Sequence, residues 1–414
     1  MGLQNRNITL LNKTKMQDDN NIQNIKADGQ NIVTNKELNI WEALIPVIAL
    51  VGMLAYNIYV YGDDALSGSN QFILLMGAAV AAIVGFFNRV KYKRMLEEIT
   101  ENVKSTTGAL LILLMVGALA GTWLISGIIP SMIYYGLQIL NPTIFLAACV
   151  IICAIISIAT GSSWTTSATI GIALIGIGKT LGIDIGMTAG AVLSGAYFGD
   201  KMSPLSDTTN LAPAMAGGEL FSHIKYMALT TIPTIVLTLI IFIIIGLNLD
   251  TTGTPQIEDK LSAIDGAFNI SPWLFIVPVL VIVMIIKKTP PLIALLTGAL
   301  LGGATAIIAQ PEIVMSIAGS ESLTFQSAYK GVMDALTVDT AVTTSSAELN
   351  DLFTAGGMKG MLGTIWLIVC AMVFGGVMDA IGALSRITDA LLKMATSIFG
   401  LFASTVASCL ALNL

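Results

Sequence analysis

Long apolar runs alternate with short polar segments along most of this chain. The runs reach or approach the roughly 20 residues that a membrane-spanning helix needs. They cover residues 41–61, 71–88, 108–128, 226–248, 272–286, 290–308 and 361–384. Aromatic residues that are typical of the membrane–water interface lie near their ends, at Trp41, Tyr59, Tyr61 and Trp273. The pattern predicts an all-α polytopic membrane protein.

The first 39 residues break this pattern, because they are polar and rich in asparagine. They contain no apolar core of the kind found in a cleaved signal peptide. A segment of such composition cannot bury enough apolar surface to fold by itself. We expect residues 1–39 to form a disordered cytoplasmic tail.

Composition agrees with a membrane protein. Of the 414 residues, 55% are hydrophobic and only 11% are charged, whereas soluble domains carry about 25% charged residues. The four cysteines lie in apolar runs, far from the sole histidine, His223; they are Cys149, Cys153, Cys370 and Cys409. Packed, reduced thiols are therefore expected rather than a zinc site. We expect no cofactor and no nucleic-acid partner.

Two polar patches interrupt the apolar pattern, at residues 160–167 and 199–213. Hydroxyls, carboxylates and amides at membrane depth are costly unless they bind something. The oxygen-bearing candidates are Asp200, Asp207, Ser162, Ser163, Thr165, Thr166, Ser203, Thr208, Thr209 and Asn210. Oxygen ligands of this kind suit a small hard cation such as sodium.

The first patch lies between two apolar runs, 143–160 and 165–178, that are separated by only four residues. One interpretation is a re-entrant hairpin whose tip stops inside the membrane, where irregular backbone is tolerated if it is buried or faces a cavity. The other is a pair of ordinary spans joined by a tight turn. We expect the hairpin, since transporters of known architecture use such elements.

The second patch ends a helix that is rich in small residues, which favour close packing. The small residues fall within 187–198, and we expect Gly199 and Pro204 to interrupt the helix after them. A proline removes a backbone donor and frees a carbonyl one turn earlier. A broken helix at this position would therefore offer carbonyl oxygens as well as side chains to a cation.

Basic residues predict the orientation in the membrane. They cluster in four places: Lys13, Lys15, Lys26 and Lys36; Arg89, Lys91, Lys93 and Arg94; Lys287 and Lys288; and Arg386 with Lys393. The positive-inside rule places these clusters in the cytoplasm. The segments 249–271 and 310–350, which are poor in lysine and arginine, are expected to face outward.

An internal repeat runs through the chain in collinear order. Residues 45–54 resemble 277–286, 74–78 resemble 295–299, 115–127 resemble 370–382, and 143–145 resemble 397–399. The charge pattern starts one copy inside and the other outside, which is typical of inverted-repeat secondary transporters. We expect a first repeat over 40–250 and a second over 251–414. Because Leu414 aligns with about Thr160, the second repeat is expected to be incomplete.

The two polar patches resemble motifs of the NhaC family of sodium/proton antiporters. The matching stretches read GSSWTTSAT over 161–169 and GAYFGDKMSPLSDTTNLA over 195–212, and the resemblance extends from about Ile40 to the end. It implies a cell-membrane transporter of the ion-transporter superfamily, with two inverted repeats that each hold a re-entrant hairpin and a broken helix. The family includes exchangers of carboxylates such as malate and lactate. A homodimer is a further expectation.

The expected mechanism is competition between sodium and protons for one site. Sodium needs about five or six oxygens with a carboxylate to offset its charge, and a carboxylate at low dielectric binds a proton readily once sodium leaves. Asp207 is preferred over Asp200 as the sodium ligand, because Lys201 follows Asp200 and offers it an ion pair. The hydroxyls have an alternative use as interhelical hydrogen bonds. Asp379 is either a further intramembrane site or a snorkelling residue close to Arg386.

The predicted function is secondary active exchange of sodium for protons, with the lipid bilayer as environment. Alternatives are a sodium-coupled malate or lactate antiporter, a channel, and a truncated fragment without transport. An enzyme is not expected. A serine hydrolase would need a base near Ser162, and the sole histidine is expected in a loop away from it.

Overall fold

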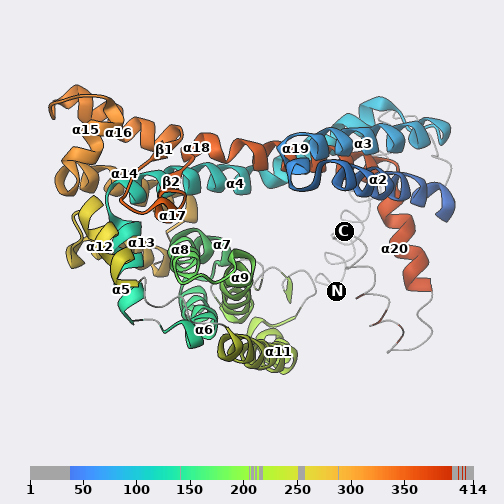
Figure 1. The fold of residues 1–414 in the computed structure, drawn as a ribbon. Coiled ribbons are helices and arrows are strands. Elements are labelled where there is room, and N and C mark those ends of the chain that lie inside the picture. The colour runs from blue at the N-terminus through green and yellow to red at the C-terminus, as the bar shows by residue number, and fades with distance from the viewer. Residues whose placement is uncertain are drawn as a thin grey trace, which may run out of the picture. The chain divides into compact units, whose positions relative to one another are not determined.

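The structure is a computed structural model that describes residues 38–139, 141–204, 206, 209, 212–213, 218–249, 257–287, 289–393, 400, 403 and 406. The described chain is almost entirely helical (Figure 1). Its first half contains α2 (Ile40–Tyr61), η1 (Gly62–Ser67), α3 (Ser69–Phe87), α4 (Tyr92–Ile125), α5 (Ile128–Ile139), α6 (Pro142–Thr160), α7 (Ser163–Thr166), η2 (Ser167–Gly171), α8 (Ile172–Thr180), α9 (Ile185–Met202) and α11 (Leu220–Asn248).

The second half adds shorter helices and one small ribbon. Its helices are α12 (Ile257–Ala267), η4 (Pro272–Phe275), α13 (Ile276–Ile286), α14 (Pro291–Ala309), α15 (Pro311–Ala318), α16 (Phe325–Thr337), α17 (Ala347–Asn350), α18 (Gly357–Gly360), α19 (Leu362–Ala380) and α20 (Ala383–Lys393). The strands β1 (Thr340–Ala341) and β2 (Thr354–Ala355) pair antiparallel, with Thr340 opposite Ala355.

Seven helices of the described chain are long and apolar enough to cross a membrane. They are α2, α3, α4, α6, α11, α14 and the helical segment Gly357–Ala380. An eighth span arises if α12 and the following η4–α13 segment, which meet at 81°, count as one. The prediction of an all-α polytopic membrane protein is confirmed.

The chain divides into two compact units, each with its own core. The first contains α2 as far as Tyr56, α3 from Ile73, the chain up to Thr100 and the part that begins at Val373. Its core gathers Ala43, Ala81, Met95, Met378 and Ile381. The end of α19 lies directly on the start of α4 in this unit, because a Cβ at Gly376 would lie 2.5 Å from the Cα of Ile99.

The second unit comprises residues 57–72 and 101–372. It contains the two apolar runs, 143–160 and 165–178, between which the tip of the first polar patch lies. The helices α6, α8, α9 and α11 lie side by side in it (Figure 1). Gly195 contacts the Val150 carbonyl, and a Cβ at Gly199 would lie 2.6 Å from the Ala154 carbonyl oxygen. Contacts therefore advance in the same direction along α6 and α9, and the two helices run parallel at backbone contact.

Residues 142–180 double back on themselves. The helix α6 spans 19 residues, about 28 Å at 1.5 Å per residue, and ends at Gly161, whose φ is +68°. The chain then returns through α7, η2 and α8, so that Gly178 meets Phe145 and Thr188 near the starts of α6 and α9. The hairpin is present, and its re-entrant placement in the membrane stays a prediction.

Two helix junctions that the repeat pairs with each other have the same backbone conformation. Gly127 separates α4 from α5 with φ +79°, and Gly382 separates α19 from α20 with φ +74°. Left-handed glycine is the usual end of a helix, because it has no Cβ to clash. Because this conformation is common at helix ends, the repeat, its inversion and its domain limits stay predictions.

A buried glutamine holds the bend after α12. Gln310 accepts a hydrogen bond from the backbone N–H of Asn269 at 3.0 Å, and its Nε2 donates to the Asn269 carbonyl at the same distance. Gln310 itself lies at the break between α14 and α15. The position of α12 within the second unit is therefore fixed by paired hydrogen bonds rather than by helix continuity.

Candidate functional site

The two polar patches of the sequence meet at the tip of the α6–α8 hairpin. The Ser163 hydroxyl donates a hydrogen bond of 2.8 Å to the Oδ2 atom of Asp200. Ser163 is buried at the start of α7, and Asp200 is half-buried in the last turn of α9. A contact between residues 37 positions apart therefore places a carboxylate beside the hairpin tip.

The tip owes its shape to a glycine followed by a serine cap. Gly161 adopts the left-handed conformation that ends α6. The hydroxyl oxygen of Ser162 then accepts hydrogen bonds from the backbone N–H of Thr165 at 3.2 Å and from its hydroxyl at 3.0 Å. Ser162 is thus the N-cap of α7, and this cap orients Ser163 toward Asp200.

The helix α9 continues farther than the sequence predicts. Gly199 does not interrupt it, and the helix runs to Met202 before Ser203 takes an extended conformation. The missing Cβ of Gly199 serves close packing on α6 instead. The helix ends because a residue that precedes a proline, here Pro204, disfavours the α conformation. The prediction of a break at Gly199 is wrong, whereas the break at Pro204 is confirmed.

Hydroxyl groups bond to backbone carbonyls at the C-terminal end of α9 and close to it. The Thr209 hydroxyl donates to the carbonyl oxygens of Asp200 at 3.2 Å and Lys201 at 3.1 Å. The Ser203 hydroxyl donates to the Ile158 carbonyl at 2.7 Å. The Ile158 and Lys201 carbonyls lie in the last turns of their helices, and the Asp200 carbonyl also accepts from the backbone N–H of Ser203 at 3.2 Å. The two side chains bond to these carbonyls and tie the segment after α9 to α6.

The interpretation in which Asp200 pairs with Lys201 is not observed. Within the described chain Asp200 accepts from Ser163 and forms no ion pair, and the side chain of Lys201 is exposed. Consecutive residues of a helix point about 100° apart. The carboxylate therefore faces the hairpin tip without a compensating cation among the residues that the structure describes.

Most of the other predicted hydroxyls bond to backbone. Thr166 donates to the Ser162 carbonyl at 2.9 Å and lies 3.4 Å from the Thr160 hydroxyl oxygen. The interpretation of these groups as interhelical and local hydrogen bonds therefore describes the geometry well. A hydroxyl that donates its proton keeps oxygen lone pairs, so the same side chains retain the capacity to face a cation.

Three hydroxyl residues of this region are not among the predicted ligands, although Thr160 and Thr169 belong to the polar stretch. Ser157 donates to the Ala196 carbonyl at 2.6 Å and so links α6 to α9. Thr160 lies at the end of α6, and Thr169 donates to the Thr165 carbonyl at 2.8 Å within η2, a π-helical turn. Such turns are frequent at functional sites. The available signal was the position of Ser157, one helical turn before Thr160, the first residue of the patch.

Other predicted site residues lie elsewhere. Asp207, Thr208 and Asn210 lie outside the described residues. Asp379 is exposed in the last turn of α19, and it belongs to the first unit. Among the described residues no group of three or more histidine, cysteine, aspartate or glutamate side chains is placed to hold a metal ion.

The cysteines and the histidine have positions that bear on rival functions. Cys149, Cys153 and Cys370 are buried free thiols, as the sequence predicts; Cys409 lies outside the described residues. His223 is not in a loop, because α11 begins at Leu220 and places it in the first turn. That correction leaves the histidine in a different helix from the hairpin that carries Ser162.

Comparison with known proteins identifies the family. The model of the Na+/H+ antiporter family matches residues 195–414. The malate-2H+/Na+-lactate antiporter of Bacillus subtilis (strain 168) is 38% identical over 342 residues, which are 81% of this chain and 69% of that protein. The chain belongs to the Na+/H+ antiporter family. No solved structure matches it.

Two further relatives show that similar proteins include different antiporters. The Na+/H+ antiporter NhaC of Alkalihalophilus pseudofirmus is 34% identical over 340 residues, 82% of this chain and 71% of that protein. The arginine/ornithine antiporter ArcD of Halobacterium salinarum is 30% identical over 377 residues, 90% and 74% respectively. The resemblance to NhaC is confirmed, and the chain is a multi-pass membrane protein of a transporter family.

Proposed function

We propose that this antiporter exchanges sodium ions for protons across the cell membrane, at the junction between the hairpin tip and the end of α9. The hydrogen bond between Ser163 and Asp200 carries the proposal. It puts a carboxylate, which forms no ion pair within the described part of the chain, next to neutral oxygens of the hairpin tip. A hard cation requires such a ligand set.

Competition for the carboxylates couples the two ions. With sodium bound, the negative charge of Asp200 and Asp207 offsets the charge of the ion. When sodium leaves, a proton takes its place, because an isolated charge in a low-dielectric site is costly. Asp207 stays a predicted sodium ligand beside Asp200, whose expected ion pair with Lys201 is not observed among the described residues. Thr209, two positions after Asp207, is hydrogen-bonded to the Asp200 carbonyl, which supports a place for this part of the second patch beside Asp200.

The parallel pair α6 and α9 is suited to move as one body. Ser157 joins α6 to the Ala196 carbonyl, and Ser203 joins the end of α9 to the Ile158 carbonyl. Hydrogen bonds in both directions, together with backbone contact at Gly195 and Gly199, resist sliding of one helix along the other. Alternating access would then carry the whole hairpin tip and Asp200 together.

We also propose that exchange needs no cofactor and that the chain has no enzymatic activity; the homodimer stays a prediction.

Sodium-driven proton movement in proteoliposomes tests this proposal. A pH dye enclosed with the full chain should report a pH change when sodium is added outside. Asp207→Asn should abolish the response and Asp200→Asn should strongly reduce it, since each removes charge that balances sodium. Thr234→Val is the matched control, because Thr234 is exposed on α11 and bonds only to its own helix. Exchange at the parental rate in both aspartate variants would contradict the site assignment.

A second candidate is sodium-coupled exchange of small carboxylates. The identity of 38% to a malate-2H+/Na+-lactate antiporter over 81% of this chain favours it. In the same proteoliposomes, malate or lactate on one side should then accelerate the sodium-driven pH change. An unchanged rate would restrict the function to sodium and protons, and discrete single-channel steps would indicate a channel instead.

A further inference from the structure

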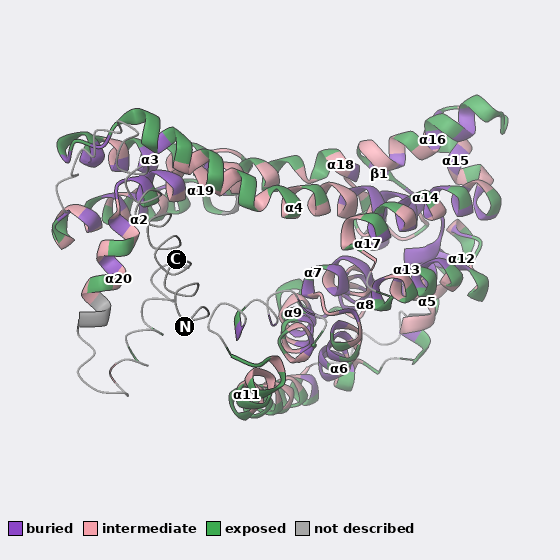
Figure 2. Ribbon diagram, turned by 180° about the vertical axis from the view of Figure 1, so that it is seen from behind, coloured by how far each residue is buried: buried purple, intermediate pink, exposed green. Residues whose placement is uncertain are grey.

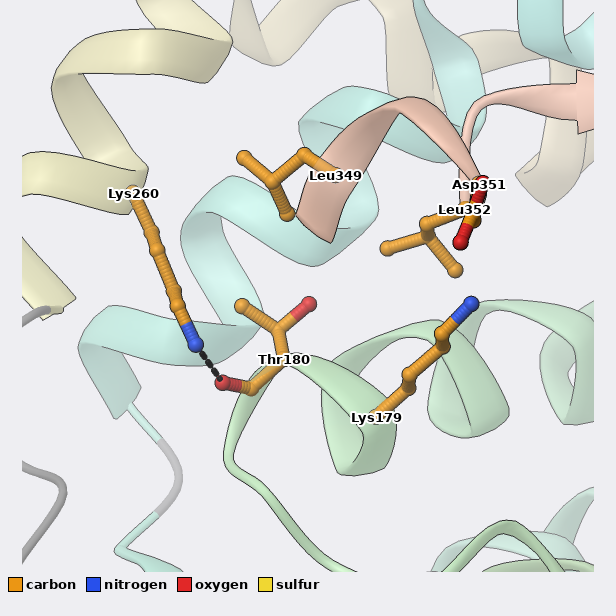
Figure 3. Close-up of a pocket in the computed structure, with 6 residues that line it drawn as sticks. All are labelled: Lys179, Thr180, Lys260, Leu349, Asp351 and Leu352. Carbon is orange, nitrogen blue, oxygen red and sulfur yellow. Dashed lines mark hydrogen bonds between the residues drawn. The ribbon is translucent and has the colours of Figure 1, made fainter. Parts of the chain in front are cut away.

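A pocket of about 250 Å³ lies at the end of the hairpin opposite its tip. Three segments of the second unit form it: the last turn of α8, the side of α12, and α17 with the residues that follow it. Its lining consists of Lys179, Thr180, Lys260, Leu349, Asp351 and Leu352 (Figure 3). Its volume is below the roughly 300–1,000 Å³ of pockets for drug-sized ligands, so it suits a small molecule.

Two lysines and one aspartate give the pocket its chemistry. The Lys260 ammonium donates a hydrogen bond of 2.8 Å to the carbonyl oxygen of Thr180, the last residue of α8. Lys179 and Asp351 approach the same space from opposite sides (Figure 3). Across the described residues neither the Lys179 ammonium nor the Asp351 carboxylate has a hydrogen bond or an ion pair. The pocket thus presents a basic side and an acidic side.

We propose that this pocket binds a small organic acid that carries a hydrogen-bond donor, a hydroxyl or an ammonium group, beside its carboxylate. The carboxylate lies between Lys179 and Lys260, which are point-charge donors. The neighbouring donor bonds to Asp351, and Leu349 and Leu352 contact the carbon chain. The inference deepens the second candidate function and rests on it only for transport of the bound acid.

Helix capping alone does not explain this arrangement. Lys330 caps a helix end elsewhere in the unit, since its ammonium donates a hydrogen bond of 2.9 Å to the carbonyl oxygen of Ala318, the last residue of α15. A cap needs one lysine and one carbonyl. The additional lysine and the aspartate that face Lys260 across a cavity are what a ligand site requires.

The predicted orientation gives the pocket a side of the membrane. Lys260 belongs to the segment 249–271, and α17 lies within 310–350; both segments are expected to face outward. An acid would therefore reach the pocket from outside the cell. The pocket and the carboxylate of Asp200 lie near opposite ends of α9. The helix rises about 18 Å from Thr188 to Asp200.

Titration calorimetry on the full chain in detergent tests the inference. The probes are L-lactate, L-malate, L-alanine, and propionate, which has no donor beside its carboxylate. Lys179→Gln and Lys260→Gln should weaken lactate binding about tenfold or more, as expected for loss of a charge-assisted hydrogen bond. The matched control Lys330→Gln should bind as the parent does. Asp351→Asn should weaken lactate and alanine but not propionate, and the preferred of lactate and alanine identifies the donor.

Three results would overturn the proposal. One is binding to Lys179→Gln and Lys260→Gln at parental affinity, and another is an equal loss in Lys330→Gln, which would show an effect on helix ends in general. The third is a parent that binds none of the four probes. If that parent still moves protons in response to sodium, the pocket inference fails while the proposed sodium/proton exchange stands. Melting temperatures without ligand show that each variant is folded.

Discussion

Hydroxyl side chains behave differently in two regions of the second unit. In the pair α6 and α9 one hydroxyl reaches across, since Ser157 bonds to the Ala196 carbonyl, whereas the Ser194 hydroxyl stays within α9. On α11 they return to their own helix: Thr234 donates to the Thr230 carbonyl at 2.8 Å and Thr238 to the Thr234 carbonyl at 2.9 Å. Figure 2 shows the reason, because α11 is largely exposed whereas α6 is packed on several sides.

The difference shows that hydroxyl content alone does not mark a site. A threonine on a lipid-facing helix satisfies its own donor by bonding one turn back, so it costs little in the membrane. A serine between two packed helices instead donates its hydrogen bond to a carbonyl of the neighbouring helix, and this bond fixes the distance between the two helices. At the candidate ion site a hydroxyl between packed segments, that of Ser163, donates to a carboxylate.

The largest expected effect breaks the backbone contact between α6 and α9. Gly199→Ala would place a Cβ 2.5 Å from that of Ser157 and 2.6 Å from the Ala154 carbonyl, and overpacking of this kind costs about 1–3 kcal/mol. The melting temperature in detergent should fall by several degrees. Gly190→Ala is the matched control on the same helix. Its Cβ would meet nothing closer than Phe242 at 3.9 Å, so it should leave stability unchanged or raise it; equal losses would refute the contact.

A smaller effect separates the two uses of serine on this helix pair. Ser157→Ala removes the bond between helices and should lower the free energy of unfolding by about 1 kcal/mol. Ser194→Ala removes a bond that stays within α9, from its hydroxyl to the Gly190 carbonyl at 2.6 Å, and should cost less. Chemical denaturation of the two variants side by side measures the difference. A larger loss in Ser194→Ala would reverse the comparison.

The smallest effect belongs to an exposed ion pair outside both regions. The Lys359 ammonium donates a hydrogen bond of 2.7 Å to Asp339 and, with its opposite charge, holds the pKa of that carboxyl below its usual value. A lowered pKa stabilises the folded state above the ordinary carboxyl pKa of about 3.9. This stabilisation is lost as the pH falls through the lowered value.

Lys359→Gln should therefore lower the melting temperature slightly at neutral pH and not at all at low pH. Salt should shrink the difference further, since both side chains are exposed. A difference that grew on acidification would contradict the sign of the pKa shift. Compared with Ser157→Ala, this variant measures how little a water-exposed polar contact contributes.

Sequence reasoning found the elements and the tip of the site. Apolar runs of spanning length predict most of the long helices, because the bilayer fixes both their length and their composition. The glycine and serine at 161 and 162 predict the turn, and Pro204 predicts the end of α9. Each of these features depends on residues that are close together in the chain, so the sequence alone predicts it.

The remaining features depend on contacts between distant segments. The sequence places Gly199 in a polar motif, and only its position against α6 shows that the helix continues through it. Ser157 looks like any hydroxyl in an apolar run until its partner on α9 is known. Lys260 and Thr180 lie 80 positions apart, so no spacing rule connects them. Tertiary packing decides such cases, and a single sequence does not encode it locally.

Proton release on sodium binding tests the central claim most directly. Sodium is added to the full chain in detergent in weakly buffered solution, and a pH dye measures protons released per chain. One site shared by sodium and protons predicts release in the parent, a sodium affinity that falls as the pH is lowered, and no release from the double variant Asp200→Asn, Asp207→Asn. Sodium binding that releases no proton from the parent, or releases as many from the double variant, would contradict the account.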